Sequence, residues 1–523
     1  MATDRIRMSG LVSGLDTETI VGALVSAASY KTTKLKNTQT KLGWKQETWK
    51  SLNSEIYSLY TGKLDNLRYE GNYNAKKATL DSDVATVSAD NNAILGSQTL
   101  EVRQMAKSGY LTGGKVSDAN GDPVKASEMV GDVAHMTEDA TIKINGKKIT
   151  ITGGMTMDQV AAAFEKAGVT ANYDSTNGRF FISSKTSGKD ANFEIEYNDA
   201  DTNDSGRQVL DALGLGYTYD EADGVRTYHS TSGADLVKIQ GQNAKIVLNG
   251  AEFESASNSF SINGLNITAK GVSERDETSP TGYKSSVITT SVDVDRIYDS
   301  IKDFFKTYNE LIKKLDTYYN ADAAKGYDVL SEQEKEAMSD DEVEAWEKKI
   351  KDSLLRRDDN LNSIINLFKD NLATSVTVNG KSYSLASFGI STLGYFEAGD
   401  NEHGMYHIDG DADDENTKSK DDSLKKMIAS DPETVSKFFS QLFKGVYTEL
   451  NQSMRSIEDT RSAMKLYDDK LLKKEYDRLT SDIAAQEAKV QEMEDHYYDK
   501  FTAMEKALSK LNTESSSFAS MLG

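Results

Sequence analysis

A long apolar stripe near the C-terminus constrains the fold of this chain more than any other feature. No glycine or proline occurs from Asp459 to Leu522. Apolar residues recur there in alternating steps of four and three, which is typical of a helix that packs along another helix. Fifty such residues would form a rod roughly 75 Å long, and one amphipathic helix of that length cannot bury its own stripe. The stripe therefore requires a helical partner, either the other end of the chain or another copy.

The N-terminal segment offers such a partner. MSGLVSGLDTETIVGALVSA (8–27) first resembles a secretory signal peptide, because Arg5 and Arg7 precede an apolar run. Asp16 and Glu18, however, separate the arginines from that run, whereas a signal peptide places its apolar core directly after the basic residues. Asp16 instead suits a helix N-cap, with Glu18 in the first turn. A weaker heptad rhythm then continues through Leu35, Leu42, Trp49, Leu52, Ile56 and Leu59.

The middle of the chain has a different pattern. From about 78 to 291, aromatic and β-branched residues alternate with polar ones, and Asn-Gly pairs at 145–146, 177–178, 249–250 and 263–264 punctuate these runs. Asn-Gly between alternating segments is the strongest local hairpin signal. One helix interrupts, with a capping box formed by Thr156 and Gln159 and an end at Gly168. A length of about 210 residues favours two β domains here.

These patterns predict an α+β multidomain chain. A helical coiled-coil stalk from paired N- and C-terminal segments carries two inserted, mainly antiparallel β domains. The expected domains are terminal coiled-coil legs (1–40 and 475–523), a helical domain (41–70 and 290–474), a β domain (71–108 and 241–289) and a second, variable β domain with one helix (109–240).

Composition narrows the possible partners. The net charge is −22 over 523 residues, which disfavours nucleic acids and anionic membranes. No apolar run reaches the roughly 18 residues that a membrane span needs. The chain has no cysteine, so disulfides and thiolate chemistry are excluded. We therefore expect neither nucleic acid nor membrane as a partner.

No pattern argues for catalysis. Nucleophile-elbow, P-loop, Rossmann and HExxH signatures are missing from the sequence. Asp409, Asp411 and Asp413 imitate the start of an EF-hand loop, but the glycine and the bidentate glutamate of that loop are replaced. His403 and His407 lie four residues apart in a loop-like context, which is poor support for a metal site. We predict no enzyme activity, no metal and no cofactor.

Several ordered motifs resemble one family. SGLVSGLDTETIVGALV (9–25), GSQTLEVRQMAKSG (96–109) and AKIVLNGAEFESASNSFSINGLNITAKG (244–271) are similar to motifs of the flagellar filament capping proteins, also called hook-associated protein 2. LASFGIST, MYHID and SDPETVSKFF follow in the family's order. The resemblance covers nearly the whole chain apart from roughly 110–240, the region that varies most.

The resemblance implies export as an unfolded chain through the flagellar type III apparatus, without a cleaved signal peptide. It implies an extracellular homo-oligomeric ring at the distal tip of the filament, with five copies favoured and four or six open. The ring would retain flagellin and promote its insertion, and an export chaperone would bind the C-terminal helix. The terminal stripes would then form the assembly interface. The predicted residues are Leu11, Leu15, Ile20, Leu24, Leu35, Leu42, Leu479, Ile483, Val490, Met493, Phe501, Met504, Leu508 and Leu511.

Three other functions stay open at this point. The chain could be another flagellar axial protein, such as a hook–filament junction protein, with similar helical ends. It could be a surface adhesin that binds through its β domains, a role compatible with capping. It could also be a secreted hydrolase with a helical stalk. The sequence does not identify what the variable β domain binds.

Overall fold

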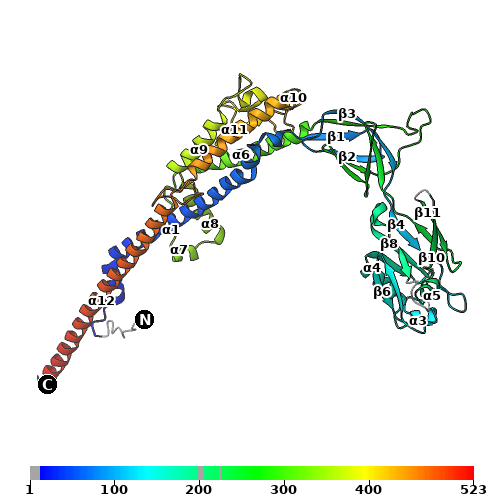
Figure 1. Cartoon of the computed structure of the whole chain (residues 1–523). Helices are drawn as coiled ribbons and strands as arrows, with labels where there is room; N and C mark the ends of the chain where they lie inside the picture. Colours follow the sequence, from blue (N-terminus) through cyan, green and yellow to red (C-terminus); the bar gives the residue numbers. More distant parts are fainter. Residues whose placement is uncertain (1–11, 198–204, 223–224, 523) are drawn as a thin grey trace. The chain divides into compact units, whose positions relative to one another are not determined.

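The computed structural model describes residues 12–197, 205–222 and 225–522. The chain divides into two compact units. The helical unit combines the residues up to 74 with those from 294 onward, and the β unit contains residues 75–293. Figure 1 shows that the helical unit unites the two ends of the chain, because the blue and red helices lie side by side. The predicted domain boundaries within each unit stay predictions.

Two long helices dominate the helical unit. Helix α1 spans Thr17–Leu59 and α12 spans Asp469–Leu522. The predicted start of α1 is confirmed, since the carboxylate of Asp16 accepts a hydrogen bond of 3.1 Å from the amide of Thr19. After Leu59 the chain continues through a π-helical turn (Tyr60–Leu64), α2 (Asp65–Leu67) and a 3₁₀ turn (Glu70–Tyr73).

The remaining helices of this unit pack around an aromatic core. They are α6 (Val294–Asn320), α7 (Glu332–Glu336), α8 (Asp340–Ser353), α9 (Asp359–Leu372), α10 (Ser423–Ser430) and α11 (Pro432–Ser453). Phe304 of α6 contacts Phe443 of α11, with ring centroids 4.3 Å apart. Ser331 and Ser339 each precede a glutamate by three residues, a spacing that predicts a capping box. Such boxes begin α7 and α8. Two short hairpins complete the unit, β18 (Val376–Val378) with β19 (Lys381–Tyr383) and β20 (Ile390–Thr392) with β21 (Tyr406–Ile408).

The β unit contains two separate hydrophobic cores. The first lies between a five-stranded sheet, in the order β1-β17-β3-β13-β14, and a three-stranded sheet, β15-β16-β2. All pairings in both sheets are antiparallel. The strands are β1 (Lys76–Leu80), β2 (Ala85–Ala89), β3 (Gly96–Gln104), β13 (Ala244–Leu248), β14 (Ala251–Ser255), β15 (Ser259–Ile262), β16 (Leu265–Ala269) and β17 (Ser286–Val292).

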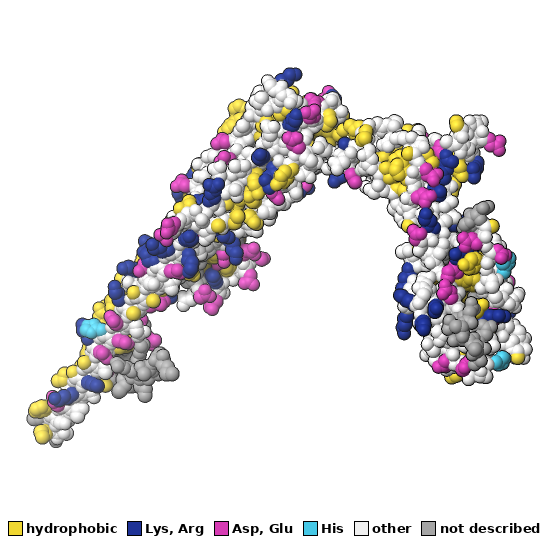
Figure 2. Space-filling view, viewed as in Figure 1, with side chains coloured by type: hydrophobic (Ala, Val, Ile, Leu, Met, Phe, Trp, Pro, Cys, Tyr) yellow, Lys and Arg dark blue, Asp and Glu magenta, His cyan; other side chains and the backbone are white. Residues whose placement is uncertain are grey.

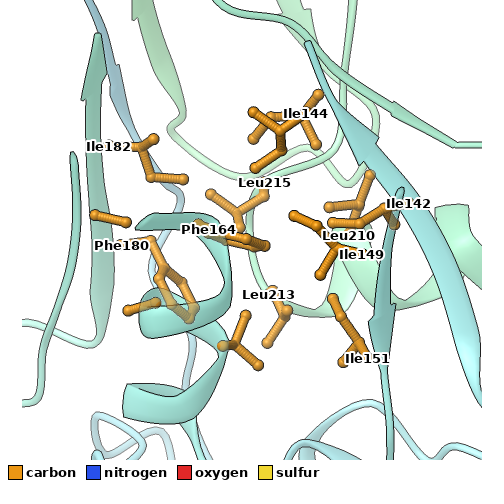
Figure 3. Packing of buried hydrophobic residues seen from close by; sticks show 14 of the residues in the cluster. Ile142, Ile144, Ile149, Ile151, Phe164, Phe180, Ile182, Leu210, Leu213 and Leu215 are labelled. Carbon is orange, nitrogen blue, oxygen red and sulfur yellow. The ribbon is translucent and has the colours of Figure 1, made fainter. Parts of the chain in front are cut away.

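The second core of the β unit is organised around α4 (Met157–Ala167). Phe164 of α4 lies against Phe180 of β8, and Figure 3 shows both rings among isoleucines and leucines from facing elements. A four-stranded sheet, β12-β4-β8-β7, and a three-stranded sheet, β6-β5-β9, supply the walls. The other elements are α3 (Val130–Val133), α5 (Ser205–Ala212), β4 (Ser108–Thr112), β5 (Ala140–Ile144), β6 (Lys147–Ile151), β7 (Val169–Asp174), β8 (Arg179–Ser187), β9 (Ile195–Tyr197), β10 (Tyr217–Ala222), β11 (Val225–Ser230) and β12 (Val237–Ile239).

The Asn-Gly hairpin predictions are confirmed. The pairs at 145–146, 177–178, 249–250 and 263–264 connect β5 to β6, β7 to β8, β13 to β14 and β15 to β16. Asn145, Asn249 and Asn263 each have φ near +50°, and the following glycine is also positive. Both central residues then adopt the left-handed conformation that a two-residue hairpin turn of type I′ requires.

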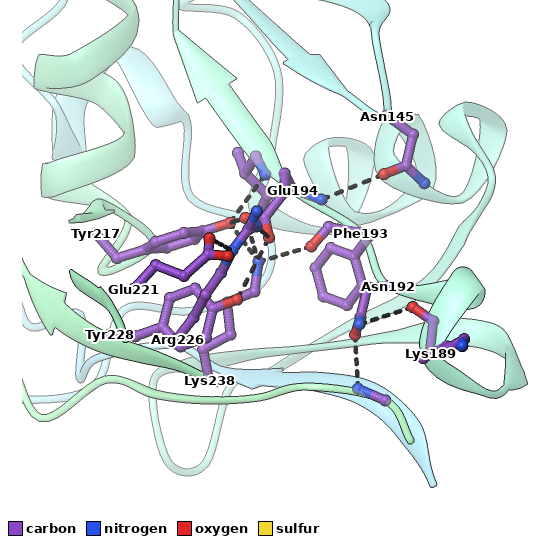
Figure 4. A network of polar contacts seen from close by, with 12 residues as sticks. Asn145, Lys189, Asn192, Phe193, Glu194, Tyr217, Glu221, Arg226, Tyr228 and Lys238 are labelled. Carbon is purple, nitrogen blue, oxygen red and sulfur yellow. Dashed lines mark hydrogen bonds and ion pairs between the residues drawn. The ribbon is translucent and has the colours of Figure 1, made fainter. Parts of the chain in front are cut away.

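A buried lysine, Lys238, connects the hairpin of β10 and β11 to the part of the β unit that contains the second core, here called the second lobe (Figure 4). The side chain of Lys238 is only 3% exposed, and its Nζ donates hydrogen bonds to Oε2 of Glu194 at 2.8 Å and to the carbonyl oxygen of Phe193 at 2.6 Å. The ring of Tyr217 lies 4.3 Å from the same nitrogen, and Arg226 binds the other oxygen of Glu194 at 2.8 Å. Burial lowers the pKa of Lys238 to about 8, against the opposing attraction of Glu194.

This burial gives the β unit a specific pH dependence. The unfolded chain keeps an ordinary lysine pKa of 10.5, so the folded state releases its proton first as the pH rises. The unfolded state then binds more protons, and the contribution of Lys238 to the free energy of unfolding increases above a pH of about 8. We expect Lys238→Met to remove this increase between pH values of about 7 and 9.5, measured by calorimetry of the full chain.

Two further variants make that measurement specific. Phe164→Ala should cost about 3–5 kcal/mol and thereby identifies the transition that belongs to the β unit. Lys185→Met replaces an exposed lysine of the same lobe and should keep the wild-type pH dependence. If Lys238→Met and the wild type respond to pH in parallel, the burial of Lys238 does not control this stability.

Candidate assembly interface

The terminal helices form an antiparallel pair with a fixed register. Nζ of Lys36 lies 2.6 Å from a carboxylate oxygen of Glu487, and the amide of Gln39 donates to the hydroxyl of Thr480 at 2.7 Å. Residue numbers that rise along α1 therefore face residue numbers that fall along α12. Exposed contacts of this kind contribute little to stability, on the order of 0–1 kcal/mol each. They show how the two helices are aligned but do not supply most of the energy that holds the helices together.

The inner end of the pair is the most firmly packed. Trp49 of α1 is buried and stacks on Tyr467, just before α12, with ring centroids 5.4 Å apart. The side chain of Asn53 accepts a hydrogen bond of 2.9 Å from the amide of Leu466 and donates one of 3.2 Å to the carbonyl of Met464. Both groups of a buried amide are thus satisfied, as burial requires. This end fixes the pair to the rest of the helical unit.

The outer end is closed by Glu505. Its carboxylate accepts hydrogen bonds from the backbone amides of Val12 at 2.9 Å and Ser13 at 3.2 Å, and from the Ser13 hydroxyl. The hydrogen bond from Ser13 lowers the pKa of Glu505. The periodicity of the sequence does not predict this contact. Met504 belongs to the apolar stripe, and Glu505, the next residue, has the pattern of an ordinary solvated acid.

The predicted interface residues fall into three groups. Leu479 and Ile483 are buried against α1, at 3% and 8% exposure. Half-buried positions are Ile20, Leu35, Leu42, Val490, Phe501, Met504 and Leu508. Exposed positions are Leu15, Leu24, Met493 and Leu511. Leu11 lies outside the described residues. The structure therefore brings the middle of both stripes together and leaves several apolar side chains uncovered.

The first part of α1 buries a neighbouring face. Val21 and Val25 are 1% and 2% exposed, whereas Leu24 is 44% exposed. The sequence offers two apolar faces one residue apart in this segment, and the periodicity alone does not choose between them. The pairing with α12 selects the valine face, so the larger leucines remain at the surface.

Beyond Glu505 the C-terminal helix carries an apolar surface that no described residue covers. Leu511, Phe518 and Met521 are 59%, 67% and 83% exposed. Figure 2 shows hydrophobic side chains gathered at this end of the helical unit. A helix with such a face is suited to lie in a groove of another protein or against other helices.

The acidic and histidine motifs have structural roles. Asp411 and Asp413 both bind Nζ of Lys302, the latter at 2.6 Å. Nδ1 of His407 lies 2.6 Å from a carboxylate oxygen of Asp414. Within the described ranges, no cluster of three potential metal ligands occurs. None of the described helices is both long enough and apolar enough to cross a membrane.

Comparison with known proteins gives a consistent result. Two family models match the chain, "Flagellar hook-associated protein 2 N-terminus" over residues 13–109 and "Flagellar hook-associated protein 2 C-terminus" over residues 241–513. The expected gap at roughly 110–240 is therefore confirmed. Flagellar hook-associated protein 2 of Halalkalibacterium halodurans is 23% identical over 478 residues, 86% of this chain and 81% of that protein. Its counterpart from Escherichia coli K12 is 24% identical over 520 residues, which are 97% of this chain and 96% of that protein.

A solved structure supports the fold. The crystal structure of the flagellar cap protein FliD D1-D2-D3 domains from Escherichia coli superposes with a TM-score of 0.50 and 18% identity. The match covers 78% of this chain and 96% of that chain.

The helix pair can be tested at its buried centre. Ile483→Asp places a charge at a buried position, which costs several kcal/mol unless the charge is paired. We expect faster hydrogen exchange of backbone amides in both α1 and α12, measured by mass spectrometry, while exchange in the β unit stays unchanged. Leu511→Asp, at an exposed position of the same helix, is the control. Equal exchange in the two variants would contradict the packing of Ile483 against α1.

Proposed function

The chain belongs to the flagellar hook-associated protein 2 family, the flagellar cap proteins, and we propose that it acts at the distal tip of the filament. There it retains exported flagellin and promotes its insertion and polymerisation. The observation that carries this proposal is the pair of terminal helices, of which α1 and residues 469–513 of α12 lie within the family matches, and which ends in an uncovered apolar surface. The role is structural and requires neither a catalytic group nor a cofactor.

The terminal legs are proposed to bind flagellin subunits. Their uncovered leucines and Phe518 supply apolar contacts, while polar residues interrupt the seam. The hydroxyl of Thr38 donates a hydrogen bond to the carbonyl oxygen of Lys34. Lys45 binds Asp358 at 2.9 Å instead of packing between the helices. A seam with such interruptions is weaker than a continuous apolar one. A weaker contact suits a cap that must release and rebind as each subunit is added.

The remaining parts of the proposal concern assembly and export. Several copies form a closed ring, with five favoured and four or six open, because a cap must cover a tubular tip. Head-to-tail contacts close into a ring only when their rotation divides the circle. The chain is proposed to travel through the flagellar type III apparatus without a cleaved signal peptide, and a chaperone holds the C-terminal helix before export. The uncovered apolar end of α12 is the surface that such a chaperone would protect.

The leg contact predicts a motility defect. Leu508→Asp introduces a charge into the half-buried outer stripe, which weakens apolar binding to flagellin. We expect loss of swimming and release of unassembled flagellin into the medium, measured by motility assay and immunoblot. Ser509→Asp adds the same charge at the adjacent exposed position and should swim normally.

A chaperone or export defect would give the same loss of motility. The amount of the secreted variant must therefore be measured first, and only a variant exported at the wild-type level tests the leg. Normal filaments at that level of export would show that Leu508 does not contribute to the interface.

The charge of the chain predicts how the ring responds to salt. Each copy carries −22, so copies in one ring repel each other unless counterions screen them. Screening acts over a Debye length of about 8 Å at physiological salt. We expect weak rings at low salt and firmer rings at moderate salt, measured by sedimentation velocity. Rings that dissociate as salt rises to the physiological level would show that complementary charges hold the contact instead.

A further inference from the structure

Three segments of the chain meet where the second lobe joins the rest of the β unit, here called the first lobe. Residues 105–107 and 241–243 connect the two hydrophobic cores. Two connections alone would form a ribbon that can bend, and motion between neighbouring domains is the default when few contacts join them. A third segment, 187–192, begins at the end of β8 and packs on both connections. The joint therefore contains more than a hinge needs.

Backbone hydrogen bonds hold the three segments together. Lys107 and Gln242 exchange two of them, at 2.9 and 3.0 Å. The carbonyl oxygen of Lys107 also accepts a hydrogen bond of 3.1 Å from the amide of Gly188. One carbonyl thus binds both of the other segments. Backbone donors and acceptors at the joint are satisfied by one another, which favours a single arrangement of the three segments.

Two further hydrogen bonds reach from the second lobe to the first. The hydroxyl of Ser187 donates to the carbonyl oxygen of Ala256, between β14 and β15, at 2.6 Å. The amide of Lys189 donates to Oδ1 of Asn243, just before β13, at 2.9 Å. These contacts lie beside the two connections, so bending the joint would break them.

Asn192 fixes the third segment to the second connection. Its Oδ1 accepts a hydrogen bond of 2.6 Å from the amide of Gly241, and its Nδ2 donates one of 2.9 Å to the carbonyl oxygen of Lys189 (Figure 4). A hinge residue must change its φ and ψ angles during a domain motion. Gly241 cannot make such a change without losing its bond to Asn192.

Three buried glycines allow the backbones to approach this closely. A Cβ atom at Gly241 would lie 2.5 Å from the carbonyl oxygen of Gly188 and 3.0 Å from the amide nitrogen of Gly109. A Cβ atom at Gly188 would lie 2.8 Å from the Cβ atom of Ala256, and φ at Gly188 is +108°. Glycine within β structure often marks such a close approach of another backbone. Here the glycines serve packing instead of flexibility.

We propose that the joint locks the two lobes of the β unit into one rigid body, so that the second lobe keeps a fixed orientation on the first. This inference goes beyond the proposed function and does not depend on it. Two of the three segments lie at the edges of the family matches, and the third lies between the matches. The variable lobe therefore supplies part of its own lock. In an assembly of several copies, each copy would present this lobe at the same angle.

Pairs of spin labels can test this rigidity in the full chain, because the sequence contains no cysteine. Thr289→Cys in β17 and Thr150→Cys in β6 place one label on each lobe, and both positions are exposed. Thr150→Cys with Asn172→Cys, an exposed position in β7, gives a reference pair within the second lobe. An excess of unlabelled chain restricts the distances measured by double electron–electron resonance to single copies. We expect the distance distribution between the lobes to be as narrow as the reference. A broader distribution in the wild type would overturn the proposal.

Substitutions in the joint test its cause. The methyl group of Gly241→Ala would meet backbone atoms of the other two segments, so we expect the distribution between the lobes to broaden while the reference pair stays unchanged. Gly271→Ala is the matched control, because a Cβ atom at this glycine of the first lobe would meet no described atom within 4 Å. Asn192→Ala removes the bridge without adding volume and should also broaden the distribution.

The reference pair also reports whether the second lobe remains folded. If Gly241→Ala unfolds that lobe, the comparison between Asn192→Ala and the wild type decides. A narrow distribution between the lobes in every folded joint variant would overturn the joint as the source of rigidity. A wild-type chain with rigid lobes that does not cap filaments would refute the proposed function and leave this inference intact.

Discussion

The pairing of the two chain ends is the interaction on which the rest of the helical unit depends. Neither α1 nor α12 can bury its apolar stripe alone, and long isolated helices are marginal in water. Trp49, Asn53 and Tyr467 fix the inner end of the pair, and Glu505 closes the outer end around Ser13. Residues 75–293, the β unit, lie in the sequence between the two segments of the helical unit. Both ends of the β unit are therefore joined to the helical unit, which the helix pair organises.

Local sequence signals predicted the fold well wherever a few adjacent residues decide the geometry. The Asn-Gly hairpins, the capping boxes at Thr156, Ser331 and Ser339, and the N-cap at Asp16 all depend on neighbours within four residues. Their energies do not change with distant partners, so the pattern is sufficient. The exclusion of 110–240 from the family resemblance was also correct, because neither family model matches those residues.

Contacts between residues that are distant in the sequence were harder to predict. The choice of Val21 and Val25 over Leu24 depends on where α12 lies, and two faces of one amphipathic segment look equally apolar in sequence. The network of Lys238, Glu194 and Tyr217 joins residues that are ordinary in isolation and meet only in the folded lobe. The aromatic pair at 395–396 reads as a typical core dipeptide, since sequence does not report that its loop points outward.

A capping protein faces opposing demands on its surface. It must expose apolar side chains to bind successive partners, and exposed apolar surface promotes aggregation. Here the exposed apolar residues include the end of α12, Leu24 of α1 and the pair at 395–396, and others such as Ile94 and Met129 lie in the β unit. The chain as a whole carries a net charge of −22. Such a charge keeps free copies soluble and apart. Binding then depends on apolar contacts that fit the surface of a partner, because like-charged copies do not attract each other.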